Sequence, residues 1–285
     1  MEAMPEIVAS ELLKTQLIAV RDVRCAGFLR HQSDEEATRA THVVFPYRGF
    51  YIRHVGQDDA VADANQVLFF NAHEGYRVSH PIAGGDASLD LVVSERLLGE
   101  LVPRSLRRAG GRVAFNQLRM RIDPRTQALV ALLRHGLQNE IAETLEAESL
   151  ALTLVRRALG PSTTHAPRAS ATRQRLVNRT KLVLAGDLAR RWTLAEIAGE
   201  VGHSPVYLTQ VFQQLEGLPL YRYHMRLRLA RSLDLLSQYD DLTALSLDLG
   251  FYSHSHFTTA FKQTYGRPPS AFRLAGPHRS RVSHR

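Results

Sequence analysis

Residues 194–212 read LAEIAGEVGHSPVYLTQVF, and this stretch decides the fold of the C-terminal part of the chain. Its first half places apolar residues at helical spacing and ends at Gly202, which can take the left-handed conformation that terminates a helix. Ser204 and Pro205 follow, and Ser before Pro is typical of a helix N-terminus. Thr193, with the glutamate three residues later, forms a capping box for the first helix. The stretch therefore predicts a helix-turn-helix unit.

The second helix of this unit has two faces. Leu208, Val211 and Phe212 recur at the spacing of an inward apolar face. The opposite face carries mostly polar side chains, which are free to meet a partner. The residues of that outward face are Val206, Thr209, Gln210 and Gln213.

The same pattern recurs further along the chain, since Ser204 and Ser253 are 49 residues apart and each begins a second helix. In the repeat, leucines form the inward face of the first helix, Gly250 ends it, and Phe257 and Phe261 face inward from the next. The outward face of that helix consists of His254, Ser255, His256, Thr259 and Lys262. A helix over about 220–236 joins the two units and carries Arg222, Arg226, Arg228 and Arg231. We therefore predict an internal duplication.

The charge of the chain is concentrated in this duplicated part. The formal net charge of the whole chain is +8. Residues 1–172 have as many acidic as basic side chains, so the entire excess lies in residues 173–285. Such an asymmetry indicates a polyanionic partner for the C-terminal part.

The N-terminal part has a different pattern. Short β-branched or alternating runs, separated by turn residues, predict strands at 41–45, 49–55, 66–70, 76–79 and 88–93. Turns are expected at 56–59, 71–75 and 84–86. Close spacing without intervening helices favours an antiparallel sandwich or barrel.

We therefore expect an α+β protein of two domains, a β-rich one followed by an all-α one with two helix-turn-helix units. The expected divisions are a sensor domain over 1–122, a helical hairpin over 123–160, a linker over 161–172, a DNA-binding domain over 173–275 and a tail over 276–285. The apolar face of the hairpin suits packing on the strands or docking a second subunit.

Composition excludes several classes of protein. With 44% hydrophobic and 22% charged residues, the chain is typical of a globular protein. Its longest apolar run, 128–133, is far shorter than a membrane span. Cys25 is the single cysteine, which excludes an internal disulfide and fits the cytoplasm. We expect no membrane association.

Residues 250–273, GFYSHSHFTTAFKQTYGRPPSAFR, resemble the signature of AraC/XylS-type transcription regulators. The landmarks are Gly-Phe, Ser-x-Phe, Phe-Lys, Gly, Pro and a closing aromatic–Arg pair. The similarity covers about residues 173–275, and residues 40–95 look more loosely like the family's cupin-like sensor domain. It implies a homodimer whose partners are double-stranded DNA, RNA polymerase and a small-molecule effector. It also implies base and phosphate contacts at the nine outward residues named above, although Thr259 stands where many members have arginine.

The effector site is assigned more loosely, to inward residues of the strands. The candidates are Tyr51, Arg53, Phe69, Tyr76, Arg77 and His80. An arginine in such a cavity would favour an anionic ligand, whereas Arg53 and Arg77 could equally face solvent.

We expect no metal and no cofactor. His42, His54, His73, Glu74 and His80 are scattered, without the spacing of a metal site. No nucleophile elbow, phosphate-binding loop or dinucleotide fingerprint occurs, so no enzyme activity is expected. Cys25 is interpreted as a small buried apolar residue.

Two other functions stay open at this point. One is a cupin-type metal-dependent enzyme with a fused helical module. The other is a regulator controlled by a partner protein, without a small ligand.

Overall fold

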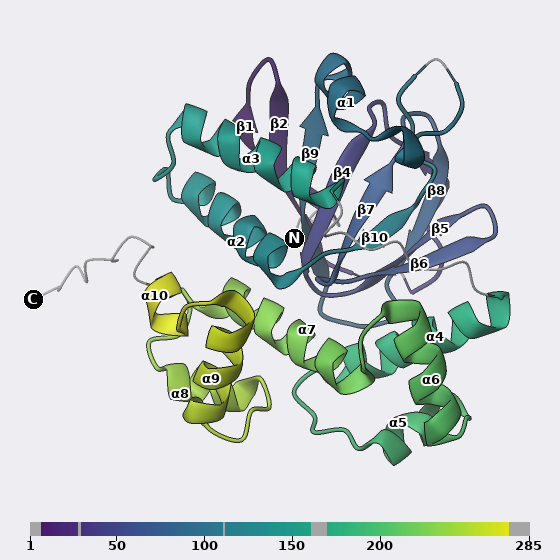
Figure 1. Ribbon diagram of the computed structural model, residues 1–285, viewed down its shortest axis with the longest axis vertical. Helices are drawn as coiled ribbons and strands as arrows, with labels where there is room; N and C mark the ends of the chain where they lie inside the picture. The colour runs from purple at the N-terminus through teal and green to yellow at the C-terminus, as the bar shows by residue number, and fades with distance from the viewer. Residues whose placement is uncertain (1–6, 28–29, 111, 161–169, 274–285) are drawn as a thin grey trace, which may run out of the picture.

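The computed structural model describes residues 7–27, 30–110, 112–160 and 170–273. The linker expected up to residue 172 lies mostly outside the described residues, and the expected tail lies wholly outside them. Figure 1 shows a β-rich N-terminal region with a helical hairpin on one side and an all-helical C-terminal region below it. The α+β two-domain fold expected from the sequence is confirmed.

Two antiparallel sheets build the N-terminal region. The strands are β1 (Ile7–Lys14), β2 (Ile18–Cys25), β3 (Glu36–Ala37), β4 (His42–Arg48), β5 (Tyr51–Val55), β6 (Asp58–Ala62), β7 (Gln66–Phe70), β8 (Gly75–Ser79), β9 (Asp86–Val93) and β10 (Arg119–Arg121). One sheet has the order β1-β2-β9-β4-β7-β10 and the other β3-β8-β5-β6. Val44 and Phe70 of the first sheet share an apolar cluster with Tyr51 of the second, so the sheets face each other as a flattened barrel.

The predicted strands all occur, as β4, β5, β7, β8 and β9. Strands β1, β2, β3, β6 and β10 were not predicted. In β2 the alternation is broken because the polar Asp22 occupies an inward position. The turn expected at 56–59 is shorter than predicted, since Asp58 and Asp59 already belong to β6. β6 forms because it pairs with β5, and local residue preferences do not show that contact.

Helices cover one face of the larger sheet (Figure 1). They are α1 (Glu95–Leu101), the short 3₁₀ helix η1 (Arg104–Leu106), α2 (Pro124–Gln138) and α3 (Thr144–Ala158). The Asp123 side chain accepts the backbone N–H of Thr126 and caps α2, as the sequence predicts. Val130 and Leu154 of the hairpin pack into the same core as Val20 and Leu91 of the sheet. The apolar face of the hairpin is therefore largely intramolecular.

The C-terminal region consists of helices alone in its described part. They are α4 (Ala171–Gly186), α5 (Leu194–Val201), α6 (Pro205–Glu216), α7 (Leu220–Leu235), α8 (Leu242–Asp248), α9 (His254–Tyr265) and α10 (Pro269–Arg273). Two helix-turn-helix units, α5–α6 and α8–α9, lie on either side of α7 (Figure 1). The expected caps form at Thr193, Ser204 and Ser253.

The turn of the second unit requires glycine. Gly250 has φ +78°, and a Cβ atom there would lie 1.9 Å from the carbonyl oxygen of Ala189. The corresponding Gly202 has φ +72° but open space around it. The second turn therefore packs directly on the segment that precedes α5, which the first turn does not.

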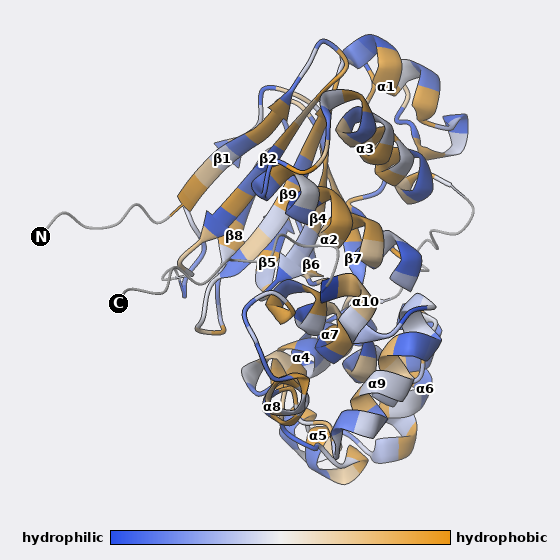
Figure 2. Cartoon of the chain, turned by 90° about the vertical axis from the view of Figure 1, so that its left-hand side faces the viewer, coloured by the Kyte–Doolittle hydropathy of each residue, from blue (hydrophilic) through white to orange (hydrophobic). Residues whose placement is uncertain are grey.

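An apolar cluster crosses the interface between the two domains, although each domain also has a core of its own. Phe50 and Val61 of the β-rich region belong to the apolar cluster that includes Leu176 and Leu227 of the helical region. Figure 2 shows the apolar residues continuing from the barrel into the helices below it. The interface between the domains is therefore itself apolar.

No described helix is long and apolar enough to cross a membrane.

Candidate DNA-binding surface and ligand cavity

The outward face of α6 is exposed as the sequence predicts. Val206, Gln210 and Gln213 are exposed, and Thr209 is half-buried. Leu208 and Phe212 are fully buried on the opposite face, and this burial fixes the rotation of the helix about its axis. The Thr209 hydroxyl donates to the Val206 carbonyl oxygen at 2.9 Å.

The outward face of α9 is formed in the same way. His254, Ser255, Thr259 and Lys262 are exposed. His256 is half-buried, because its ring packs against Phe251 and Tyr252 at centroid distances of 5.5 and 5.8 Å. Phe257 and Phe261 are fully buried and anchor the helix, as the sequence predicts.

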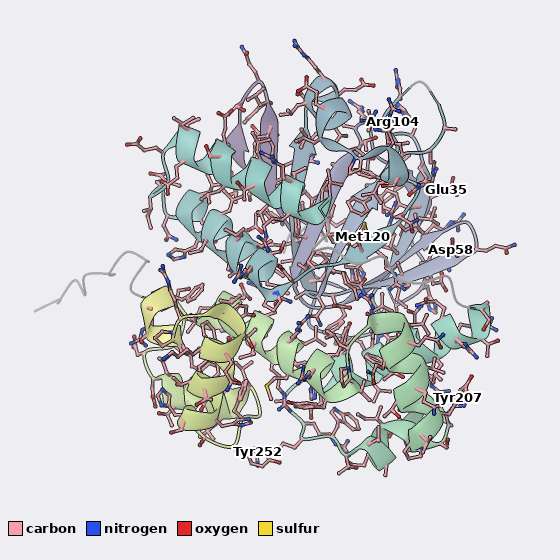
Figure 3. All side chains as sticks on the ribbon, viewed as in Figure 1. Glu35, Asp58, Arg104, Met120, Tyr207 and Tyr252 are labelled. Atoms are coloured by element: carbon pink, nitrogen blue, oxygen red, sulfur yellow. The ribbon has the colours of Figure 1, made fainter. Side chains whose placement is uncertain are left out.

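A groove of about 500 Å³ runs between the two units, and we call it the inter-unit groove. Thr209 of α6 and His256 of α9 both line it, so the two helices meet one continuous surface. Tyr252 is 70% exposed on its rim, and the Arg191 guanidinium lies 4.1 Å from the centroid of that ring. Figure 3 labels Tyr252 at the lower edge of the helical domain. Arg191 and Tyr252 were not predicted to belong to this surface. Arg191 could have been noticed in the sequence, because it stands beside the aromatic Trp192 just before α5.

Two of the arginines on α7 are structural. Arg228 is 6% exposed and donates to carbonyl oxygens of Leu188, Ala189, Arg190 and Gly250 at 2.7–3.1 Å. Arg231 pairs with Asp234 of the same helix. Arginines on the joining helix suggest a polyanionic partner, but the side chains of these two residues are engaged inside the protein.

The barrel encloses a cavity of about 290 Å³, which we call the barrel cavity. Both sheets line it. Its polar lining consists of Arg21, Glu36, Thr38, His42, Tyr51, Tyr76, His80, Asp86, Ser88 and Asp90. Carboxylates outnumber the single arginine, so the lining favours a ligand with hydrogen-bond donors or a positive charge.

The structure brings only part of the predicted effector site together. Tyr51, Tyr76 and His80 line the barrel cavity. Arg53 is fully buried behind the wall, where it donates to the Phe69 carbonyl oxygen at 2.7 Å and lies 3.7 Å from the Phe70 ring centroid. Phe69 itself packs in the core between sheet and helices.

Arg77 lies on the outside of the barrel, with its side chain 48% exposed and 3.9 Å from Glu35. No predicted arginine therefore reaches the cavity. The arginine that does line it is Arg21.

Burial sets the charges in the cavity. It lowers the pKa of His42 to about 4 and raises the pKa of Asp90 to about 6. The two groups are 4.0 Å apart, yet near neutral pH only the carboxylate is charged. At the other end, the contacts of His80 with Asp86 and Cys25 raise the pKa of the imidazole to about 10.

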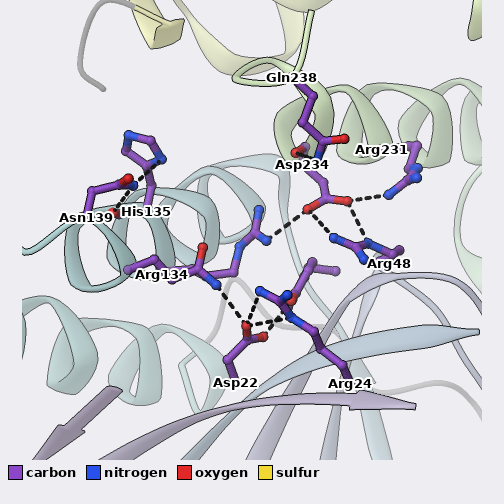
Figure 4. Close-up of polar contacts among 11 residues, drawn as sticks. Asp22, Arg24, Arg48, Arg134, His135, Asn139, Arg231, Asp234 and Gln238 are labelled. Carbon is purple, nitrogen blue, oxygen red and sulfur yellow. Dashed lines mark hydrogen bonds and ion pairs between the residues drawn. The ribbon is translucent and has the colours of Figure 1, made fainter. Parts of the chain in front are cut away.

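Buried charges join the two domains at one side of the interface (Figure 4). Asp234 of α7 is 4% exposed. Arg48 of β4 and Arg134 of α2 each lie 2.8 Å from its carboxylate. These arginines hold the pKa of Asp234 below its usual range although burial alone would raise it. The carboxylate therefore stays charged and fixes α7 against both β4 and α2.

A second buried cluster lies at the other side of the interface. Lys181 of α4 is fully buried, and its ammonium group lies 3.4 Å from Asp63 and 2.9 Å from Glu216. The Tyr223 hydroxyl donates to Asp63. This cluster could not be predicted from the sequence, because its members are far apart along the chain.

The histidines considered for a metal site are not brought together. His42 lines the cavity, whereas the His54 imidazole contacts Asp59 at 2.6 Å and Ser79 at 2.9 Å. His73 is exposed. The described residues do contain one group of potential metal-binding side chains, which are Cys25, His80 and Asp86.

A protein-family model described as a helix-turn-helix domain matches residues 197–275. The chain is 30% identical over 93 residues to the HTH-type transcriptional activator AarP of Providencia stuartii, which covers 32% of this chain and 69% of that protein. It is 30% identical over 136 residues to the activator RhaR of Klebsiella pneumoniae, 47% of each chain. It is 30% identical over 99 residues to the uncharacterised regulator YidL of Escherichia coli, 34% of this chain and 33% of that protein.

The fold and its two outward helix faces define a protein with a double helix-turn-helix domain. With the relatives above, the chain belongs to the AraC/XylS family of helix-turn-helix transcription regulators. That family consists of regulators and not of enzymes, as expected. The matches span less than half the length of RhaR and of YidL.

Proposed function

We propose that this protein is a sequence-specific DNA-binding transcription regulator that inserts α6 and α9 into successive major grooves of one duplex. The observation that carries this function is that Thr209, on the outward face of α6, and His256, on that of α9, border the same inter-unit groove. Successive major grooves on one side of B-DNA lie about 34 Å apart. The rigid attachment of both units to α7 would hold the two helices at one fixed spacing.

The outward side chains suit reading and anchoring. Gln210 and Gln213 can each bond an adenine edge, and the methyl group of Thr209 can pack on a thymine methyl. Lys262, exposed near the C-terminus of α9, suits a phosphate contact. Base readout would therefore lie mainly on α6, with α9 adding backbone contacts and His254 or His256.

The barrel cavity is the proposed effector site. Its carboxylates and its tyrosines favour a small polar ligand that donates hydrogen bonds, such as an amine or a polyol. Strand β4 offers the link to the DNA-binding domain. His42 and Val44 near its start line the cavity, and Arg48 at its end pairs with Asp234 of α7. A ligand that shifts β4 would therefore change how α7 is held.

Regulation at a promoter implies a homodimer and contact with RNA polymerase. Support for the dimer comes from three apolar side chains left exposed on or beside the hairpin, since Leu132 is 39%, Ile141 48% and Leu145 74% exposed. Such a row on an otherwise packed hairpin fits an interface with a second copy.

The experiment is capture of genomic fragments by the full-length protein, followed by footprinting over a series of salt concentrations. We expect two protected segments one helical turn apart, repeated as half-sites, and an affinity that falls steeply with salt. Binding without preference over random DNA would overturn sequence-specific regulation. A single protected segment would overturn the role of one of the two units.

A further inference from the structure

A side-chain cluster with metal-binding chemistry lies at one end of the barrel cavity. One ligand atom each from Cys25, His80 and Asp86 lie within 4.8 Å of one another. All three residues line the barrel cavity, so the cluster can be reached through it. They come from both sheets, with Cys25 ending β2, Asp86 beginning β9 and His80 directly following β8.

The backbone builds this cluster firmly. Cys25 and Asp86 are direct partners in the register of β2 and β9, so their side chains share one face of the sheet. Behind them the chain is packed too closely for any residue but glycine. A Cβ atom on Gly85, whose φ is +68°, would lie 2.4 Å from the Cys25 carbonyl oxygen. The positions of both donors are therefore fixed by packing and not by loop conformation.

The third donor is deeply buried and incompletely bonded. His80 is 4% exposed, and its Nδ1 has no hydrogen-bond partner among the described residues. Its Nε2 lies 2.8 Å from Asp86 Oδ2, yet that oxygen lacks an aligned hydrogen bond. Leaving buried polar atoms unsatisfied costs about 1–3 kcal/mol each, so such atoms indicate a missing partner.

The chemistry of these three side chains determines which metal ion they can bind. A thiolate, an imidazole and a carboxylate are the ligands that Zn²⁺ takes in proteins, at about 2.0–2.3 Å. At those bond lengths tetrahedral ligand atoms lie about 3.3–3.8 Å apart, so the 2.8 Å contact between His80 and Asp86 would open by about 0.5 Å when the ion binds. A purely oxygen-binding ion such as Mg²⁺ would not use the thiolate.

We infer that Cys25, His80 and Asp86 form a Zn²⁺ site with three protein ligands, whose fourth position opens into the barrel cavity. A bound ion would tie the two sheets together at that end. It would also offer a Lewis-acidic position to a water molecule or to a ligand in the cavity. This inference does not depend on DNA binding.

The test uses the tag-free full-length protein, stripped with a chelator and titrated with Zn²⁺ and with Co²⁺. We expect one tightly bound ion per chain and, with Co²⁺, the charge-transfer absorption of a thiolate ligand. Cys25→Ser should remove that absorption, and Cys25→Ser and His80→Ala should each weaken Zn²⁺ binding at least tenfold. His31→Ala, at an exposed histidine of the same domain, serves as the matched control and should bind as the unaltered protein does.

A second readout needs no variant, because Cys25 is the single cysteine of the chain. Zn²⁺ should slow alkylation of the native protein by iodoacetamide at least tenfold, and the chelator should restore the rate. Absence of both the cobalt absorption and this protection would overturn the site. So would tight Zn²⁺ binding that is unchanged in a folded Cys25→Ser protein.

Discussion

The guanidinium of Arg228 donates to the carbonyl oxygen of Gly250 at 3.1 Å, and this contact joins the two helix-turn-helix units through α7. The same side chain donates to Leu188, Ala189 and Arg190, which precede the first unit. A single buried arginine therefore holds the turn of one unit against the start of the other. The spacing of α6 and α9 is set by this contact and not by the length of α7 alone.

Replacing Arg228 with lysine should test that role. Lysine cannot reach all of these carbonyl oxygens at once, so we expect a loss of about 3 kcal/mol in the free energy of unfolding. Affinity for DNA with both groove segments should fall more than affinity for DNA with one. Denaturant titration and binding assays would measure this, with Arg222→Lys at an exposed position of α7 as the control. Equal effects of the two variants would contradict the structural role.

The two turn glycines should respond differently to alanine. Both have positive φ, which costs about 1 kcal/mol for a residue with a Cβ atom. Only at Gly250 would that atom also meet the backbone of Ala189. We expect Gly202→Ala to lower the melting temperature slightly and Gly250→Ala to lower it severely. Similar melting temperatures for the two variants would show that the second turn can move away.

Gln210→Ala and Lys262→Ala should separate reading from anchoring. The first should relax sequence preference at one base pair, at a cost of about 1–3 kcal/mol for the specific site only. The second should weaken specific and random DNA alike and reduce the salt dependence by about one charge. Competition binding at several salt concentrations distinguishes the two. Loss on random DNA equal to that on specific DNA for Gln210→Ala would refute its assignment.

Lys181→Met should uncouple the domains. The substitution keeps a similar volume but removes the ammonium group that lies between the buried Asp63 and Glu216, which costs about 3–5 kcal/mol. Equilibrium unfolding would measure the loss, and hydrogen exchange would show whether β6 and α4 open together. Lys14→Met, on the exposed strand β1, should change stability by only a few tenths of a kcal/mol. A loss below about 1 kcal/mol for Lys181→Met would mean that water reaches the cluster.

Asp90→Asn should stabilise the protein near neutral pH. The pKa of Asp90 is raised to about 6 by burial, so the folded state binds this proton more tightly than the unfolded state does. Its contribution to stability is therefore present at low pH and is lost as pH rises from about 4 to about 6. Two pKa units correspond to about 3 kcal/mol.

The stability difference between Asp90→Asn and the unaltered protein should grow by that amount between pH 4 and pH 7. Asp58, exposed on β6 and labelled in Figure 3, is the control site, where an Asn substitution should show no such growth. A difference that stays constant with pH would mean that Asp90 is hydrated in the cavity.

Features that depend on residues close together in the sequence could be predicted, and features that depend on contacts between distant residues could not. The helix-turn-helix units were predicted because caps such as Ser204 and apolar faces such as Leu208 and Phe212 act within a few turns of one helix. The predicted faces of α6 and α9 follow from the same periodicity. The strand pair β1–β2 and the strands β3, β6 and β10 were not predicted, because cross-strand pairing outweighs weak local preferences there.

The sequence by itself determined the two-part architecture, the duplicated unit and the outward residues of its second helices, since helical periodicity and capping are local. Only the tertiary structure decided which residues line the barrel cavity. In that structure Arg53 lies in the core and Arg77 at the surface, and Cys25, His80 and Asp86 lie close together. It also placed Lys181 and Asp234 in buried clusters between the domains. These outcomes depend on how sheets and helices pack, and contacts between residues far apart in sequence leave no periodic signal in the chain.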